Sequence, residues 1–348
     1  MKGSLCALRF IAYSQGKGVK AVDVYPIEIG CGGKVVHATV YRRVVKGRPY
    51  HCAGTILAVG GMSVRGNRDP RLVAICRAMA RCGFLVIVPS FVDVERFMIK
   101  EETVRTIAGA IGAIAGDGDL CPTGRVSVFA PSFSAGMCLI AASLPEVAAS
   151  VVSICAVGAF GNVDTVLRFI LAEQSCDEYA RMIILRNFIH HSIGRNPRIA
   201  KALEIAYLDN GFRREEPELP SYMERLGISE RRLFQLLRND PENRMMHWRR
   251  IVKRSSGVRR MLNRLSVVSS LYGIKAQVVL VHGAEDRVIP PSESVLLHER
   301  LVILKKDARL LLTPLISHGD VRMTPGMLPE ILRLLGAFAH FFRRAFDR

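Results

Sequence analysis

The sequence lacks the compositional bias of disordered, collagen-like and small disulfide-rich proteins. Its 348 residues are 49% hydrophobic and 23% charged, with a mean hydropathy of +0.21. This much apolar side chain, without a short repeat, is typical of a chain that buries a core. The length fits one large domain, or one domain that carries an inserted module.

Cysteine pairs at metal-binding spacing are absent. The nine cysteines are scattered, odd in number and contain no C-x-x-C, which disfavours both a zinc cluster and a disulfide framework. Several lie in apolar runs, for example Cys76 and Cys155, where a thiol fills core space. We therefore expect reduced thiols, no metal ion and no organic cofactor. No H-E-x-x-H, EF-hand or phosphate-loop pattern is present either.

Long hydrophobic runs are also missing. No stretch of about 18 uncharged apolar residues occurs, so a membrane-spanning helix is not expected. Residues 1–13 are mildly apolar, but Arg9 interrupts them and no small-residue cleavage site stands out. The interpretation is a cytoplasmic protein without a signal peptide.

Acidic residues are scarce, at 31 against 49 lysines and arginines, which gives a net charge of +18. Such an excess of positive charge favours anionic binding partners: acidic substrates, an anionic membrane surface or nucleic acid. The sequence does not indicate an oligomeric state.

Strand-like and helix-like segments alternate through the first half of the chain. Asp69-Pro70 is a good helix start, because Asp caps free N–H groups and Pro suits the first helical position. Alternation of this kind predicts an α/β fold, with a mostly parallel sheet and helices on both faces. The expected strands are 34–42, 54–59, 84–89, 125–130 and 149–157, and the expected helices are 70–83, 101–115 and 134–143.

The alternation stops near residue 158 and resumes near residue 276. We predict an α/β core formed by residues 1–158 and 268–348, interrupted by an all-helical cap insertion at 159–267. An insertion at this point is well placed to cover a site at the carboxyl ends of the strands. The second part of the core contains expected strands at 276–282 and 308–313 and expected helices at 292–301 and 325–343.

The sharpest local signal is the run from Ala130 to Gly136 (APSFSAG), where a strand leads directly into a helix through serines and small residues. In a nucleophile elbow, the serine occupies a strained turn and small neighbours on both sides prevent collisions. We assign Ser134 as the elbow serine, with Ser132 and Gly136 as its small neighbours. An ordinary strand–helix junction with a capping serine is the alternative.

Three further loops follow expected strands, and in a parallel sheet they leave the same edge. The first contains Gly60-Gly61-Met62, where the glycines allow close approach of backbone to a substrate. The second contains Glu285 and Asp286, and the third contains His318.

The order Ser134, Asp286, His318 resembles that of the α/β-hydrolase superfamily. The segments GAEDRVIPP and SHG are similar to its acid and histidine loops, and Gly60-Gly61-Met62 resembles its oxyanion loop, with Gly60 where His is usual. The resemblance covers roughly residues 20–158 and 268–345, and the insertion occupies the position of that superfamily's lid.

The resemblance implies a serine hydrolase that works through an acyl-enzyme. Ser134 would attack a carbonyl carbon, His318 would move the proton and Asp286 would orient the imidazole. The backbone N–H groups of Met62 and Ala135 would form the oxyanion hole. Glu285 is the rival acid, and Asp286 is preferred because it matches the superfamily's G-x-x-D pattern.

The implied substrate is a small molecule with an acyl group, most simply a carboxylic ester, with an amide or thioester as alternatives. An acyltransferase would use the same residues. A different class of function, a non-catalytic scaffold or a binder of anionic surfaces, also stays open at this point.

A basic segment in the insertion motivates that last alternative. It has eight basic residues and no acidic one: Arg244, Arg249, Arg250, Lys253, Arg254, Arg259, Arg260 and Arg264. The simplest interpretation is a solvated helix face. The sharper hypothesis is a cap suited to acidic acyl substrates or to peripheral contact with an anionic membrane. Nucleic-acid binding is disfavoured, since no recognition motif or aromatic platform is visible.

Overall fold

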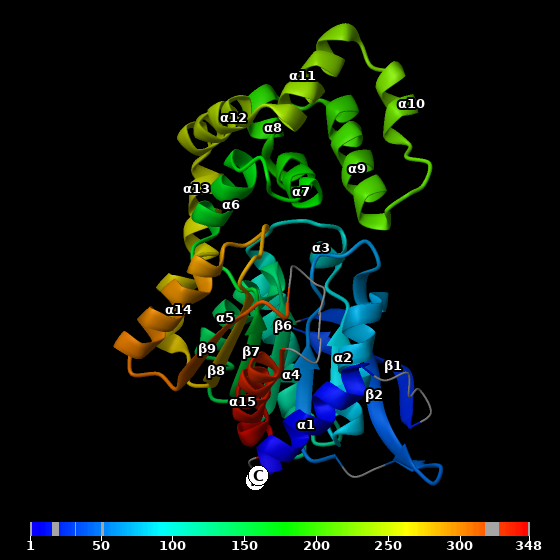
Figure 1. Cartoon of the computed structure of the whole chain (residues 1–348), viewed down its shortest axis with the longest axis vertical. Helices are drawn as coiled ribbons and strands as arrows, with labels where there is room; N and C mark the ends of the chain where they lie inside the picture. Colours follow the sequence, from blue (N-terminus) through cyan, green and yellow to red (C-terminus); the bar gives the residue numbers. More distant parts are fainter. Residues whose placement is uncertain (1, 16–20, 32, 50–51, 317–326, 347–348) are drawn as a thin grey trace.

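The computed structural model describes the whole chain apart from residues 1, 16–20, 32, 50–51, 317–326 and 347–348. The described residues form one sheet of nine strands, around which the helices pack (Figure 1). The strands are β1 (Val22–Cys31), β2 (Lys34–Val45), β3 (Arg48–Pro49), β4 (Thr55–Ala58), β5 (Leu85–Pro89), β6 (Val126–Pro131), β7 (Val151–Val157), β8 (Gln277–Gly283) and β9 (Ala308–Thr313).

The sheet order is β1-β2-β5-β4-β6-β7-β8-β9, with the short β3 paired to β2. Strand β2 is antiparallel to both β1 and β5, and every later pair along the sheet is parallel. The carboxyl ends of β4, β6, β7, β8 and β9 therefore meet at one edge, as the sequence predicts.

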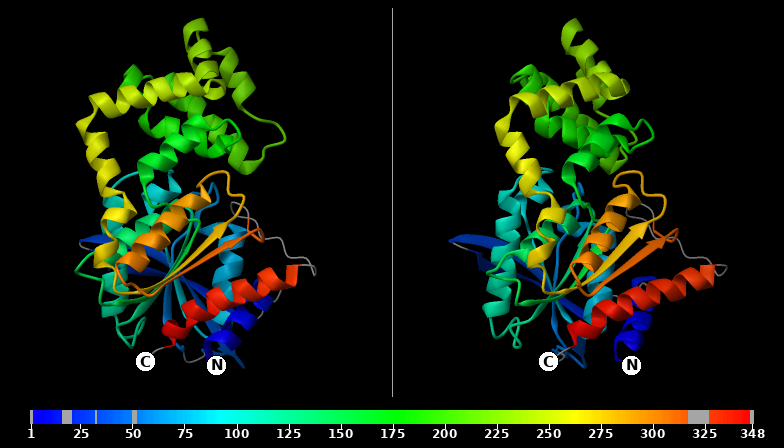
Figure 2. Two further views of the ribbon diagram at one scale, coloured as in Figure 1. Left: turned by 60° about the vertical axis from the view of Figure 1, so that its left-hand side comes forward. Right: turned by 90° about the vertical axis from the view of Figure 1, so that its left-hand side faces the viewer.

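Helices cover both faces of this sheet (Figure 2). Neighbouring residues of β4 point to opposite faces: Ile56 joins the apolar cluster under α1, α2 and α15, whereas Leu57 joins the cluster under α4 and α5. This is the predicted α/β architecture. The core helices are α1 (Lys2–Gln15), α2 (Pro70–Arg81), α3 (Val92–Glu95), α4 (Glu102–Gly116), α5 (Phe133–Ser143), α14 (Pro291–Ile303) and α15 (Leu328–Ala345).

Between β7 and β8 the chain is fully described and forms no strand. We call residues 159–267 the cap, and its helices stand beyond one edge of the sheet (Figure 1). They are α6 (Val163–Ala172), α7 (Glu178–Phe188), α8 (His190–Ile193), α9 (Pro197–Phe212), α10 (Leu219–Glu224), α11 (Ile228–Asn239), α12 (Pro241–Arg254) and α13 (Ser256–Arg264).

The basic segment of the cap is not uniformly a surface. Arg244 is fully buried, and its guanidinium donates to the carbonyls of Leu171, Leu237 and Arg238 and to Gln174 Oε1. Burial lowers the pKa of Arg244 to about 10, and the nearby charge of Arg181 acts in the same direction. The expectation that Arg244 is solvated is therefore wrong, because it donates to carbonyls of α6 and α11. The other seven basic residues are exposed.

Candidate active site

The turn between β6 and α5 carries the backbone strain of a nucleophile elbow, and it does so at Ser132. Ser132 has φ 57° and ψ −139°, a conformation that costs a non-glycine residue about 1–3 kcal/mol. Its N–H donates to the Val157 carbonyl at 2.6 Å, and its carbonyl accepts from the Ala135 N–H at 2.9 Å. The residue itself is half-buried, so it can be reached from outside. The prediction of the strained turn at Ser134 is thus wrong by two positions.

Ser134 lies inside the first turn of α5 and has no exposed surface. Its hydroxyl donates to the Gly60 carbonyl at 2.6 Å. A buried hydroxyl with this acceptor does not face a substrate, so the structure does not support Ser134 as the nucleophile. The sequence could have indicated the alternative, because Ala130 and Ser134 flank Ser132 with small residues at the same spacing.

The shift of the strained turn to Ser132 also changes the roles proposed for the residues around it. The Ala135 N–H already donates to the Ser132 carbonyl and is buried, which removes Ala135 as an oxyanion donor. Phe133 follows Ser132 and begins α5, so its N–H has no acceptor within the helix. Gly136 is needed for packing, because a Cβ at this position would overlap the ring of Phe160.

The Gly60-Gly61-Met62 loop lies against the elbow. A Cβ built at Gly61 would be 3.8 Å from the Ser132 Cβ and 3.7 Å from the Pro131 Cγ. At Gly60, a Cβ would come within 2.9 Å of Asn67 Oδ1, so this position has no room for a side chain. The predicted oxyanion loop and the strained serine are therefore neighbours.

Of the two acidic residues in its loop, Asp286 is the one whose carboxylate is fixed by hydrogen bonds. Its Oδ1 accepts the N–H groups of Val288 and Ile289 at 2.8 and 3.0 Å. Asp286 is buried, whereas Glu285 is exposed. This contrast supports Asp286 over Glu285, since a triad acid needs a fixed orientation.

Ser132 and Asp286 approach the same end of β7. The Ser132 N–H bonds to Val157, the last residue of that strand, and a Cβ built on the next residue, Gly158, would be 3.6 Å from Asp286 Oδ2. The structure therefore brings two of the predicted loops to one edge. His318 lies outside the described residues. Strand β9, which precedes it in the sequence, ends at the same edge of the sheet.

His282 lies close to Asp286, with 3.6 Å between Nε2 and Oδ2, but it has a structural role. His282 is fully buried, its Nε2 donates to the Ile289 carbonyl at 2.9 Å, and its Nδ1 lies 2.6 Å from Ser294 Oγ.

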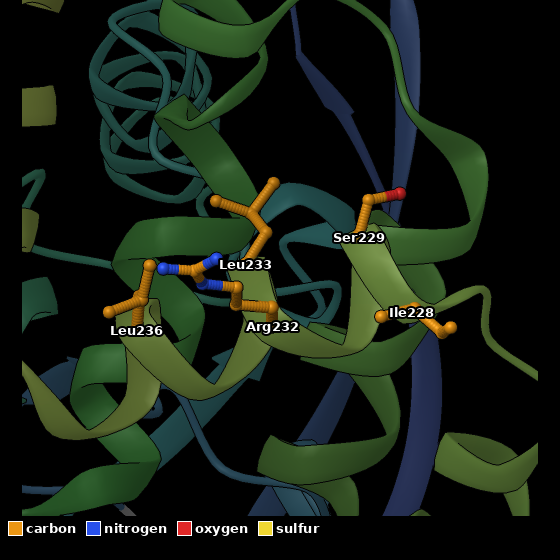
Figure 3. A pocket seen from close by; sticks show the side chains of 5 residues that line it. All are labelled: Ile228, Ser229, Arg232, Leu233 and Leu236. Carbon is orange, nitrogen blue, oxygen red and sulfur yellow. The ribbon is translucent and has the colours of Figure 1, made fainter.

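Other features of the molecule offer less chemistry. The described residues contain no cluster of three or more His, Cys, Asp or Glu side chains suited to a metal ion. None of the described helices combines the length and apolar character needed to cross a bilayer. A shallow groove along α11 holds Ile228, Ser229, Arg232, Leu233 and Leu236 (Figure 3). It belongs to the outer part of the cap, away from the sheet (Figure 1).

Solved structures resemble this chain across nearly its whole length. An acylaminoacyl peptidase from Pyrococcus horikoshii matches 94% of the chain with a TM-score of 0.52 and 12% identity. A puromycin-hydrolyzing peptidase from Mycobacterium tuberculosis matches 94% with a TM-score of 0.54 and 14% identity. The chain spans only 42% and 40% of the lengths of these two peptidases.

A smaller protein matches end to end. Est1E from Butyrivibrio proteoclasticus has a TM-score of 0.52 and 11% identity over 93% of this chain and 99% of its own. No protein-family model matches the sequence, and no curated protein is significantly similar to it. The sheet topology, the strained serine turn and these structural likenesses show that the chain has the α/β-hydrolase fold.

Proposed function

We propose that this protein is a serine hydrolase that cleaves a carboxylic ester through an acyl-enzyme, with Ser132 as the nucleophile. The observation that carries the proposal is the strained and accessible Ser132 turn, which lies beside Gly61 and shares the end of β7 with Asp286. A residue held in such a conformation presents its side chain above the sheet, where a substrate can meet it.

Each residue then has a definite task. Ser132 Oγ attacks the acyl carbon while His318 takes its proton, and His318 returns that proton to the leaving alcohol. Asp286 fixes the imidazole tautomer and stabilises the imidazolium. The N–H groups of Phe133 and Met62 hold the oxyanion. Water repeats the sequence on the acyl-enzyme and releases the acid.

An ester is favoured over a peptide substrate by the extent of the likenesses. An esterase from Pyrobaculum calidifontis is matched over 92% of its length, whereas the acylaminoacyl peptidase is matched over 42%. An amide or thioester, or transfer of the acyl group to an alcohol, would use the same residues.

A fluorophosphonate probe tests the assignment directly, because it phosphonylates an activated serine. We expect the wild-type protein and Ser134→Ala to be labelled, and Ser132→Ala to remain unlabelled although folded by circular dichroism. Labelling that survives in Ser132→Ala and disappears in Ser134→Ala would identify Ser134 as the nucleophile. A folded wild-type protein that neither reacts with the probe nor hydrolyses p-nitrophenyl acetate would favour a non-catalytic scaffold.

A series of p-nitrophenyl esters of increasing chain length defines the acyl group. If the cap covers an apolar site, kcat/KM rises from acetate toward longer acyl chains, by up to about tenfold for each well-buried pair of methylenes. A flat or falling series would place the acyl chain in water.

We also propose that the basic face of α12 and α13 contacts an anionic lipid surface. Support comes from the distribution of charge: residues 244–264 contain eight basic and no acidic residues, while the rest of the cap contains 12 basic and 13 acidic residues. Cations elsewhere in the cap form ion pairs, such as Arg168 with Asp164 and Lys201 with Glu204. Five exposed residues of the basic face have no ion pair within the described part of the chain: Arg249, Arg250, Lys253, Arg254 and Arg260.

A lipid surface is favoured over single-stranded nucleic acid because the one tryptophan of the segment, Trp248, is buried and offers no stacking platform. The test is co-sedimentation with phosphatidylcholine vesicles, with and without phosphatidylglycerol. We expect binding only to the anionic vesicles, reversal by salt, and loss in the triple variant Arg249→Glu, Arg250→Glu, Lys253→Glu. The control Lys201→Glu changes a paired cation and should still bind. Binding to duplex DNA but not to these vesicles would overturn the lipid assignment.

A further inference from the structure

The loop that carries Met62 is held mostly by the core. Ser134 Oγ donates to the Gly60 carbonyl, Ser63 Oγ donates to Asp69 Oδ2 at 2.7 Å, and Asn67 Nδ2 donates to the Pro89 carbonyl at 3.0 Å. Burial opposes ionisation of Asp69, but hydrogen bonds from Arg71 and Ser63 outweigh it and lower its pKa to about 2. Asp69 thus stays a charged acceptor for this loop at any physiological pH.

The cap supplies a hydrogen bond to the same loop. Tyr179, the second residue of α7, places its hydroxyl 3.1 Å from the Met62 carbonyl, to which it donates. The peptide unit that contains the Met62 N–H therefore lies between two units whose carbonyls each accept a side-chain hydroxyl, Ser134 at Gly60 and Tyr179 at Met62. Between them stands Gly61, the residue type with the greatest backbone freedom.

The ring of Tyr179 is itself fixed. It meets Phe97 edge-on at 5.8 Å between ring centroids and Tyr207 edge-on at 6.4 Å. Gly211 of α9 makes room for the ring, since a Cβ there would lie 2.8 Å from Tyr179 Cε2. Burial and the neighbouring Tyr207 raise the pKa of Tyr179, which keeps the phenol a proton donor.

We propose that Tyr179 is a positioning residue that sets the direction of the Met62 N–H in the oxyanion hole, so that the cap must be seated for the core to react at full rate. The inference rests on the proposed hydrolase function. An unanchored Gly61-Met62 peptide can turn its N–H away from the oxyanion. Bonds on both flanking carbonyls, Gly60 and Met62, fix the two ends of this peptide and oppose that rotation. Removal of an oxyanion donor costs about 10²–10³ in kcat, and partial misorientation should cost less.

The test is Tyr179→Phe, which keeps the ring and removes the hydroxyl. With p-nitrophenyl acetate we expect kcat to fall about tenfold while KM changes less than about twofold. The Ki of a trifluoromethyl ketone, which forms an oxyanion on the serine, should rise by the same factor as kcat/KM falls. Tyr207→Phe is the matched control, because the Tyr207 hydroxyl makes no hydrogen bond among the described residues, and it should keep wild-type values.

The outcomes distinguish the positioning role of Tyr179 from the hydrolase function. If the wild type is active and Tyr179→Phe retains its kcat and inhibitor affinity, the positioning role is wrong and the hydrolase proposal stands. A fall in kcat without a matching loss of ketone affinity would also reject this role, since it would show a defect outside the oxyanion hole. If Tyr179→Phe unfolds at a lower temperature, kinetics measured well below that transition still decide the question. If the wild-type protein shows neither esterase activity nor probe labelling, the proposed hydrolase function itself is wrong, and the role of Tyr179 falls with it.

Discussion

The core and the cap use their buried polar side chains differently. In the core, Ser134, Asp286 and Glu293 each accept from or donate to backbone at the carboxyl edge of the sheet, where the elbow lies. In the cap, Arg181 and Arg244 are buried, and their guanidinium groups donate to carbonyls at the ends of cap helices. The buried carboxylate of Asp209 in α9 accepts the Leu219 N–H and pairs with Arg214.

The difference teaches where substitutions should act. Under the proposed function, the loops bonded to Ser134 and Asp286 border the reacting serine, so the loss of either side chain should appear in the rate. The buried arginines of the cap bond carbonyls at the ends of cap helices, so their loss should appear in the free energy of unfolding. The following substitutions test that division, from the largest expected effect to the smallest.

Asp286→Asn should give the largest effect. The amide leaves the loop shape nearly intact but favours the wrong imidazole tautomer, and by analogy with other triads kcat should fall about 10⁴-fold, equivalent to about 5.5 kcal/mol. The exposed neighbour provides the control, since Glu285→Gln should leave kcat within about twofold of wild type. Ester hydrolysis measures both. Equal losses of kcat in the two variants would contradict the assignment of Asp286 as the acid that orients the imidazole.

Arg244→Met should destabilise the cap by about 3–5 kcal/mol, because three carbonyls and the Gln174 amide lose a buried donor. Urea denaturation measures the free energy of unfolding. The matched control is Arg249→Met on the exposed face of the same helix, expected to lie within about 0.5 kcal/mol of wild type. If the two variants are equally stable, the hydrogen bonds of Arg244 contribute nothing net.

The sequence predicts the parallel part of the sheet well, because buried parallel strands are short apolar runs separated by amphipathic helices. It does not reveal β1, whose side chains are mostly exposed or half-buried and whose partner is the antiparallel β2. Helix α1 is also missed. Its apolar residues pack on α2 and α15, which are remote in the sequence, so tertiary contact rather than local pattern defines it.

At the site, the loops are predictable and the choice of serine is not. Asp286 stands in a turn whose pattern differs clearly from its surroundings. Two serines at positions 132 and 134 each have small residues two places away, so composition cannot separate them. Only the structure separates them, through the positive φ at Ser132 and the buried, hydrogen-bonded hydroxyl of Ser134.

Ser134→Ala should have a moderate effect of about 1–3 kcal/mol on unfolding, since the buried Gly60 carbonyl loses a donor. Because Gly60 begins the proposed oxyanion loop, kcat should also fall, by about tenfold at most. This variant is the sharpest single test of the comparison, as a core group should affect both stability and rate. An unchanged kcat would reduce Ser134 to a packing role.

Glu293→Gln tests the junction between the two regions and should have the smallest effect. The Glu293 carboxylate is buried in the core helix α14, where Oε2 accepts the N–H groups of Gly161 and Asn162 at 2.9 and 2.8 Å, just before the first cap helix. Glutamine keeps an acceptor at this point but removes the charge, which about halves the strength of such bonds. We expect a loss of about 1 kcal/mol in urea unfolding and a kcat within twofold of wild type. Glu293→Ala removes the Oε2 acceptor of both N–H groups and should lower the free energy of unfolding further. A larger loss in Glu293→Gln than in Glu293→Ala would show that the added amide N–H, rather than the missing charge, disturbs the junction.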